Sequence, residues 1–172
     1  MRSERLKMVH ITIRKGSITT LNVEAIVNPA NSYGYMGGGV AWVIKNVGGA
    51  IIEEEAIAQA RFHIGTAVLT SGGGLIARHV IHSPTMEEPA EKTNVLNIQQ
   101  AVQAALELAD QNQFTKIAFP GMGTGVGGVG KKEAAQTMVK AIKAFPAHFL
   151  KEVVLIGKED EMVKAFQEAL NP

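Results

Sequence analysis

Short apolar stretches recur along the chain and predict strands. Val9, Ile11 and Ile13 alternate with polar residues, which is the period of a half-buried strand, and this strand ends at Lys15-Gly16. The later stretches are continuously apolar, which indicates strands that are covered on both faces. They are Ala25-Ile26-Val27, Ala67 to Leu69, Val80-Ile81, Ile117 to Phe119 and Val153 to Ile156.

Helical spacing of apolar residues appears between and after these stretches. It runs from Ile98 to Ala109 and from Ala135 to Phe145, and a third helix is predicted from Val163 to Leu170. Strands and helices that alternate in this way are typical of an α/β domain with a largely parallel sheet, and right-handed crossovers place helices on both faces. We expect one domain over residues 1–172.

The composition excludes several classes of protein. The chain has 172 residues and no cysteine, so disulfides, thiolate metal sites and a cysteine nucleophile are absent. Its 17 basic and 16 acidic residues give a net charge of +1, so the protein has no overall electrostatic field that would attract nucleic acid or an anionic membrane. No apolar run approaches the ~20 residues of a membrane helix, and the charged first seven residues do not resemble a signal peptide. We therefore expect a cytoplasmic protein.

Two glycine-rich loops carry the strongest functional signal. Residues 28–40 read NPANSYGYMGGGV and residues 120–130 read PGMGTGVGGVG, each between an apolar strand and a predicted helix. Neither loop contains Lys, Arg, Asp or Glu. An anion held between them must therefore be bound by backbone N–H groups and helix N-termini, which predicts a phosphate-bearing ligand and no metal or cofactor.

The second loop also comes close to two nucleotide-binding motifs. Residues 125–132 lack only the hydroxyl residue of the motif GxxxxGK[ST], because Lys132 stands at its last position. Gly123, Gly125 and Gly128 match GxGxxG, but no acidic residue follows in the expected context. We therefore favour a third interpretation, in which a diphosphate lies between the two glycine-rich turns.

Several motifs together resemble the macro domain family. They are Gly16-Ser17-Ile18-Thr19, residues 25–32 (AIVNPANS), Gly37-Gly38-Gly39-Val40-Ala41 and residues 119–128 (FPGMGTGVGG), in the order and spacing of that family. The resemblance extends over nearly the whole chain. It implies a three-layer α/β/α sandwich with a mixed, largely parallel sheet of about six strands.

The resemblance also implies a ligand and its contacts. Macro domains bind ADP-ribose at the carboxyl edge of the sheet, and hydrolytic members release an acetyl ester, a 1″-phosphate or a protein side chain from the distal ribose. Carried over, Asn31 contacts that ribose and helps to place a water molecule. The implied ligand-binding residues are Ser17, Ile18, Asn28, Ala30, Asn31, Gly37, Gly38, Gly39, Val40, Pro120, Gly121, Gly123, Thr124, Gly125, Val126 and Gly127. From the residues alone, Asn28 or Asn31 can equally stabilise the turn through its own backbone.

Four departures from the family bear on activity. Ser17 replaces an Asp that accepts from the adenine amino group, Gly127 and Gly157-Lys158 stand where aromatic residues are frequent, and Ala41 replaces an Asp that activates water. We expect a module that binds ADP-ribose, a derivative such as O-acetyl-ADP-ribose, or ADP-ribosylated protein, with modest hydrolysis at most. The alternative is a pure binding module for ADP-ribose, another nucleotide or RNA ends, although the neutral charge disfavours nucleic acid.

The sequence leaves the roles of a few polar and aromatic residues open. His82, at the end of a predicted strand, is either an acid or base at the sheet edge or a structural histidine. Glu53-Glu54-Glu55 is expected on a solvated helix face, and residues 83–92 are expected to form an exposed loop. Tyr33 and Tyr35 either cover the cleft or lie on its outer surface.

Overall fold

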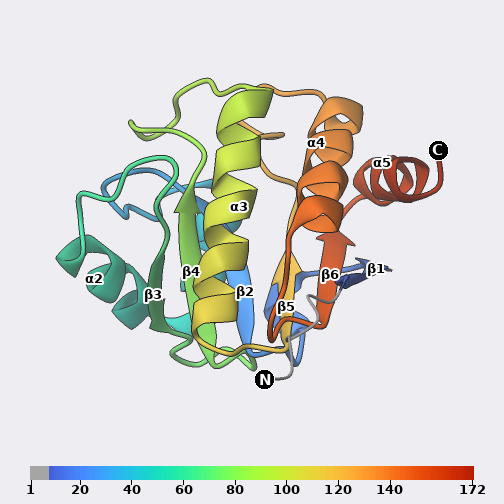
Figure 1. The fold of residues 1–172 in the computed structure, drawn as a ribbon. Helices are drawn as coiled ribbons and strands as arrows, with labels where there is room; N and C mark the ends of the chain where they lie inside the picture. Colours follow the sequence, from blue (N-terminus) through green and yellow to red (C-terminus); the bar gives the residue numbers. More distant parts are fainter. Residues whose placement is uncertain (1–7) are drawn as a thin grey trace.

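The computed structural model describes residues 8–172, and in these residues a six-stranded sheet forms the centre of the molecule (Figure 1). The strand order is β1-β6-β5-β2-β4-β3, and all neighbours pair in parallel except β3, which is antiparallel to β4. The strands are β1 (His10–Lys15), β2 (Ala25–Ala30), β3 (Val68–Ser71), β4 (His79–Pro84), β5 (Lys116–Phe119) and β6 (Glu152–Gly157). The fold is therefore the mixed, largely parallel α/β type that the sequence predicts.

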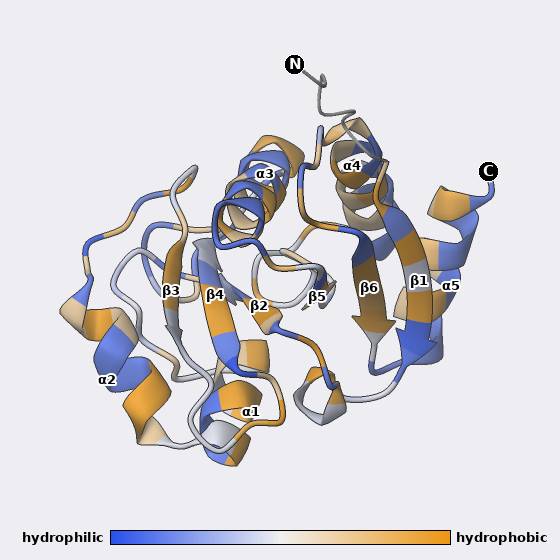
Figure 2. Ribbon diagram, turned by 60° about the horizontal axis from the view of Figure 1, so that its bottom comes forward, coloured by the Kyte–Doolittle hydropathy of each residue, from blue (hydrophilic) through white to orange (hydrophobic). Residues whose placement is uncertain are grey.

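Helices cover both faces of the sheet, as Figure 2 shows with the bottom of the molecule turned toward the viewer. One layer contains α3 (Val95–Gln111), α4 (Lys131–Ala144) and α5 (Asp160–Leu170). The other layer contains the short 3-10 helix η1 (Ile18–Thr20), α1 (Gly39–Gly48) and α2 (Ala50–Ala58). Each layer encloses its own apolar core, which explains why the central strands are apolar on both sides. Within the described residues, no helix is long and apolar enough to cross a membrane.

The predicted elements are confirmed, with longer helices than the apolar pattern indicates. The helix α3 begins three residues before Ile98, because the Asn94 side chain caps it by accepting from the Asn97 N–H (2.9 Å). The expected exposed loop at residues 83–92 is partly wrong. Ser83 and Pro84 belong to β4 and are buried, and the Ser83 hydroxyl donates to the Ala101 carbonyl (2.6 Å). The charged segment 1–7 lies outside the described residues.

The expected solvated face at residues 53–55 is also corrected. Glu53 accepts from the Lys45 ammonium (2.7 Å) and from the Met36 N–H (2.6 Å), so it joins α2 to the first glycine-rich loop. Glu55 accepts from the Ser71 hydroxyl (2.5 Å), which ties α2 to β3. Only Glu54 is exposed. Two of these carboxylates therefore hold elements together, which a helical charge run does not reveal.

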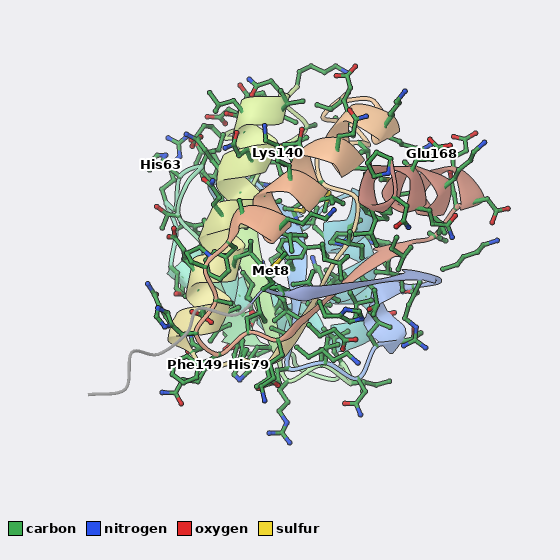
Figure 3. The ribbon with its side chains drawn as sticks, turned by 45° about the vertical axis from the view of Figure 1, so that its right-hand side comes forward. Met8, His63, His79, Lys140, Phe149 and Glu168 are labelled. Atoms are coloured by element: carbon green, nitrogen blue, oxygen red, sulfur yellow. The ribbon has the colours of Figure 1, made fainter. Side chains whose placement is uncertain are left out.

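Asp110 organises the end of the sheet where the parallel strands begin. Its buried carboxylate accepts from the N–H groups of His148, Phe149 and Leu150 at 2.8–3.2 Å. Phe149 and His79, the first residue of β4, both lie at this lower end in Figure 3. Burial raises the pKa of Asp110, but the three N–H groups lower it further than burial raises it, so the pKa lies below its ordinary value.

We expect Asp110→Ala to lower the free energy of unfolding by about 1–3 kcal/mol at pH 7, because the buried N–H of Leu150 and the partly buried N–H groups of His148 and Phe149 lose a charged acceptor. A carboxyl whose pKa is lower in the folded state stabilises that state at pH values above its unfolded-state pKa of about 4. This contribution is lost as the pH falls through the folded-state pKa. Urea unfolding at pH 7 and pH 3 measures both effects, with the exposed Glu54→Gln as the control. An equal difference from wild type at both pH values contradicts this account.

Candidate ligand-binding cleft

The two glycine-rich loops meet at the carboxyl edge of the sheet, marked by the upper arrowheads in Figure 1. The first loop leaves β2 and leads into α1, and the second leaves β5 and leads into α4. Because β2 and β5 are neighbours in the sheet, the topology places the loops side by side. A crevice at this edge is where parallel α/β sheets bind ligands.

Two hollows lie along the loops. Hollow A, about 450 Å³, is lined by Gly16, Ser17, Ile18, Gly39, Val40, Val43, Pro120, Gly121, Thr124, Gly125, Lys131, Ile156, Gly157, Lys158, Glu159 and Met162. Hollow B, about 540 Å³, is lined by Pro29, Ala30, Asn31, Tyr35, Gly37, Gly38, Gly39, Val40, Ala41, Thr85, Met86, Pro89, Ala90, Gly121, Gly123, Thr124, Gly125, Val126 and Gly127. Both hollows share Gly39, Val40, Gly121, Thr124 and Gly125. They therefore form one cleft whose midpoint lies over both loops.

The N-terminus of α1 opens on this midpoint. Gly38 is its N-cap, and neither a capping side chain nor an acidic residue occupies the first turn. The helix starts at Gly39, which has a φ of +59°. The first N–H groups of a helix carry partial positive charge and lack partners within the helix. The shared centre of the cleft therefore favours an anion without any cationic side chain.

Close packing shapes the second loop. A Cβ at Gly121 would lie 2.6 Å from the Met162 sulfur, and one at Gly127 would lie 2.7 Å from the Gly123 carbonyl oxygen. The loop therefore has no room for an aromatic side chain at position 127. Gly38 and Gly125 differ, since a Cβ at either position would have no neighbour within 4 Å and neither residue has a positive φ. Backbone strain is thus no reason for glycine at these two positions.

Asn31 holds its own loop while it lines hollow B. Its Oδ1 accepts from the N–H groups of Tyr33 (3.0 Å) and Tyr35 (3.3 Å), and its Nδ2 donates to the Tyr35 carbonyl (2.9 Å). The turn-stabilising role that the sequence left open is therefore present. The second Nδ2 hydrogen makes no hydrogen bond to any of the described residues, so the amide retains one donor beside the cleft.

Asn28 and His82 lie in the core, and neither lines hollow A or B. The Asn28 Nδ2 donates to His82 Nδ1 (3.1 Å), so His82 carries its proton on Nε2 and donates to the Thr70 hydroxyl (2.9 Å). Burial lowers the pKa of His82 to about 3, which keeps the ring neutral. An acid or base role for His82 at the sheet edge is therefore wrong, and the placement of Asn28 corrects its assignment to the cleft.

Hollow A offers an apolar slot with a polar rim. Ser17 caps η1 and shares a hydrogen bond with the Thr19 hydroxyl (2.7 Å), so this side chain is already engaged. A Cβ at Gly157 would lie 2.9 Å from the Met162 Cβ, which means that Met162 fills the space of a side chain at position 157. At the rim, Lys131 pairs with Glu161 (2.9 Å) and Glu159 (3.7 Å).

Except for Asn28, the structure gathers every sequence-predicted site residue along the cleft. Among the lining residues that sequence reasoning missed are Thr85, Met86, Pro89 and Ala90 after β4, and Met162 at the start of α5. No local motif marks these residues, because it is the order of the strands in the sheet that brings their segments to the cleft. In residues 8–172, no group of three or more His, Asp or Glu is placed to hold a metal ion.

Comparison with known proteins identifies the family. The family model of the Macro domain matches residues 27–138, which include both glycine-rich loops. The chain belongs to the Macro domain family. An uncharacterized protein of Aquifex aeolicus is 51% identical over 160 residues, which cover 93% of this chain and 97% of that protein.

Solved macro domains share the fold. The Trypanosoma brucei macrodomain in complex with ADP superposes with a TM-score of 0.85 at 26% identity, covering 94% of this chain and 69% of that one. The same protein in complex with ADP-ribose gives 0.84 at 25% identity over the same shares. The macro domain architecture that the motifs imply is therefore confirmed.

Proposed function

We propose that this macro domain binds ADP-ribose along the whole cleft. The adenine base of ADP-ribose occupies hollow A, and the distal ribose occupies hollow B. The diphosphate lies between them, over the shared residues at the start of α1. The observation that carries this proposal is the junction of the two hollows over an uncapped helix N-terminus between glycine-rich loops. The complexes of the similar Trypanosoma brucei macrodomain with ADP and ADP-ribose support it.

The physiological ligands are ADP-ribose and derivatives substituted at the distal ribose, including ADP-ribosylated proteins. Turnover of such derivatives is slow. The lining of hollow B contains no Asp, Glu, His or Lys, so no strong general base or acid faces the distal ribose. The one free hydrogen of the Asn31 amide donates to the distal ribose, or to a water molecule beside it during hydrolysis. Binding is therefore the main activity, and hydrolysis is secondary.

Calorimetric titration tests the binding mode. We expect ADP-ribose to bind in the presence of chelator, with an affinity that falls only weakly with salt, because backbone dipoles in a partly enclosed cleft are screened less than surface charges. ADP should bind more weakly than ADP-ribose, since it leaves hollow B empty, and AMP should bind more weakly still. A strict requirement for Mg²⁺, or equal affinity for AMP and ADP-ribose, contradicts the proposal.

A further inference from the structure

Tyr35 ends an ordered stack beside hollow B. The Arg61 guanidinium lies 4.4 Å from the centre of the Tyr33 ring, and the Tyr33 and Tyr35 rings stack at 5.6 Å with an interplanar angle of 11°. Glu88 fixes the opposite end of the stack at the protein surface, because it accepts from both the Arg61 guanidinium and the Tyr33 hydroxyl, each at 3.2 Å. Tyr33 covers one face of Tyr35, and 51% of Tyr35 stays exposed. One face of its ring is therefore open beside hollow B.

The loop that carries Tyr35 is held firmly in place. Asn31 binds the backbone of Tyr35 on both its N–H and its carbonyl, and the next residue, Met36, is fully buried with its N–H on Glu53. Gly34 packs against the end of α2 so closely that a Cβ there would lie 2.9 Å from the Ala56 carbonyl carbon. The Tyr35 ring is therefore preorganised, which reduces the entropic cost of ligand binding.

The surroundings of this face are uncharged. Hollow B continues past the first glycine-rich loop to Met86, Pro89, Ala90 and Val126, and none of its lining residues carries a charge. The segment that provides three of these residues also contains Glu87, Glu88 and Glu91. A dianionic group here would find no cationic side chain in the lining, and Arg61, the cation of the neighbouring stack, is already paired with Glu88.

We propose that the Tyr35 face is a subsite for an uncharged, planar group attached to the distal ribose. This inference rests on the proposed function, and it selects among the derivatives considered there. The ligand that fits best is an ADP-ribose glycoside with a flat neutral substituent, and a 1″-phosphate fits poorly. Tyr35 is then a residue that determines specificity by contact with the substituent.

Three stable probes test this subsite by calorimetry: the 1″-O-benzyl glycoside, the 1″-O-methyl glycoside and the 1″-phosphate of ADP-ribose. We expect wild type to bind the benzyl glycoside about 2- to 10-fold more tightly than the methyl glycoside, because stacking on an aromatic ring is worth this much. The 1″-phosphate should bind more weakly than the methyl glycoside. Tyr35→Ala should abolish the benzyl preference, so that the benzyl and methyl glycosides bind with affinities within about 2-fold of each other, a difference of at most ~0.4 kcal/mol.

Two variants control the experiment. Tyr35→Phe keeps the ring and should keep the benzyl preference, and Trp42→Ala removes a half-exposed aromatic residue of α1 that lines neither hollow. An unchanged benzyl preference in Tyr35→Ala, or tighter binding of the 1″-phosphate than of the methyl glycoside, overturns this inference alone when ADP-ribose binds normally. Failure of wild type to bind ADP-ribose overturns the proposed function and this inference with it.

Discussion

Gly125→Glu is expected to weaken ADP-ribose binding by more than about 100-fold. Gly125 lines both hollows at their junction, where the proposal places the diphosphate. A glutamate there brings a negative charge next to the phosphates, and two like charges 4 Å apart repel by ~4 kcal/mol at an effective dielectric constant of 20. Because a Cβ at this position would have no neighbour within 4 Å and Gly125 has no positive φ, the protein should fold normally.

Gly130→Glu is the matched control for this variant. It introduces the same charge five residues later, at the N-cap of α4, which lines neither hollow and also has open space for a Cβ. Calorimetry should show near-normal ADP-ribose affinity for Gly130→Glu, and thermal unfolding should show normal stability for both variants. Retained affinity in Gly125→Glu would mean that the ligand binds elsewhere.

Ala41→Asp is expected to raise the turnover of ADP-ribose 1″-phosphate by about 100-fold, the lower end of what a well-placed general base contributes. Ala41 lines hollow B, close in sequence to the glycines that precede α1. Ala41 is buried beside the core of the α1 layer, but at the third residue of α1 the helix dipole offsets part of the cost of a carboxylate, and thermal unfolding checks that the variant folds. Product analysis by chromatography, at saturating substrate, measures the rate.

Ala41→Asn tests whether the effect of Ala41→Asp comes from the basicity of the new side chain or from its size. It has nearly the same size as Asp but cannot take a proton, so it should leave the slow wild-type rate unchanged. Asn31→Ala, in the Ala41→Asp background, should lower the rate by more than it lowers affinity, because placement of water matters mainly in the transition state. Fast wild-type turnover that survives Asn31→Ala would show that other residues carry the chemistry.

The sequence alone determined the strands, most of the helices and the two glycine-rich loops. These features depend on local patterns: apolar runs for buried strands, and glycine without charged neighbours for backbone that approaches an anion. Because parallel strands direct their carboxyl ends to one edge, the pattern also predicts that residues as distant as Gly39 and Gly125 meet there. The macro domain family follows from the same motifs.

Only the tertiary structure decided how individual side chains are used. Asn28 and Asn31 are three residues apart in one motif, yet Asn28 turns into the core to hydrogen-bond His82 and Asn31 faces hollow B. Tyr35 stacks on Tyr33, whose ring also contacts Arg61 from a separate loop. The residues that bury these side chains and hydrogen-bond to them belong to elements that are distant in the chain. A local sequence pattern contains no information on which distant residues pack at a given position.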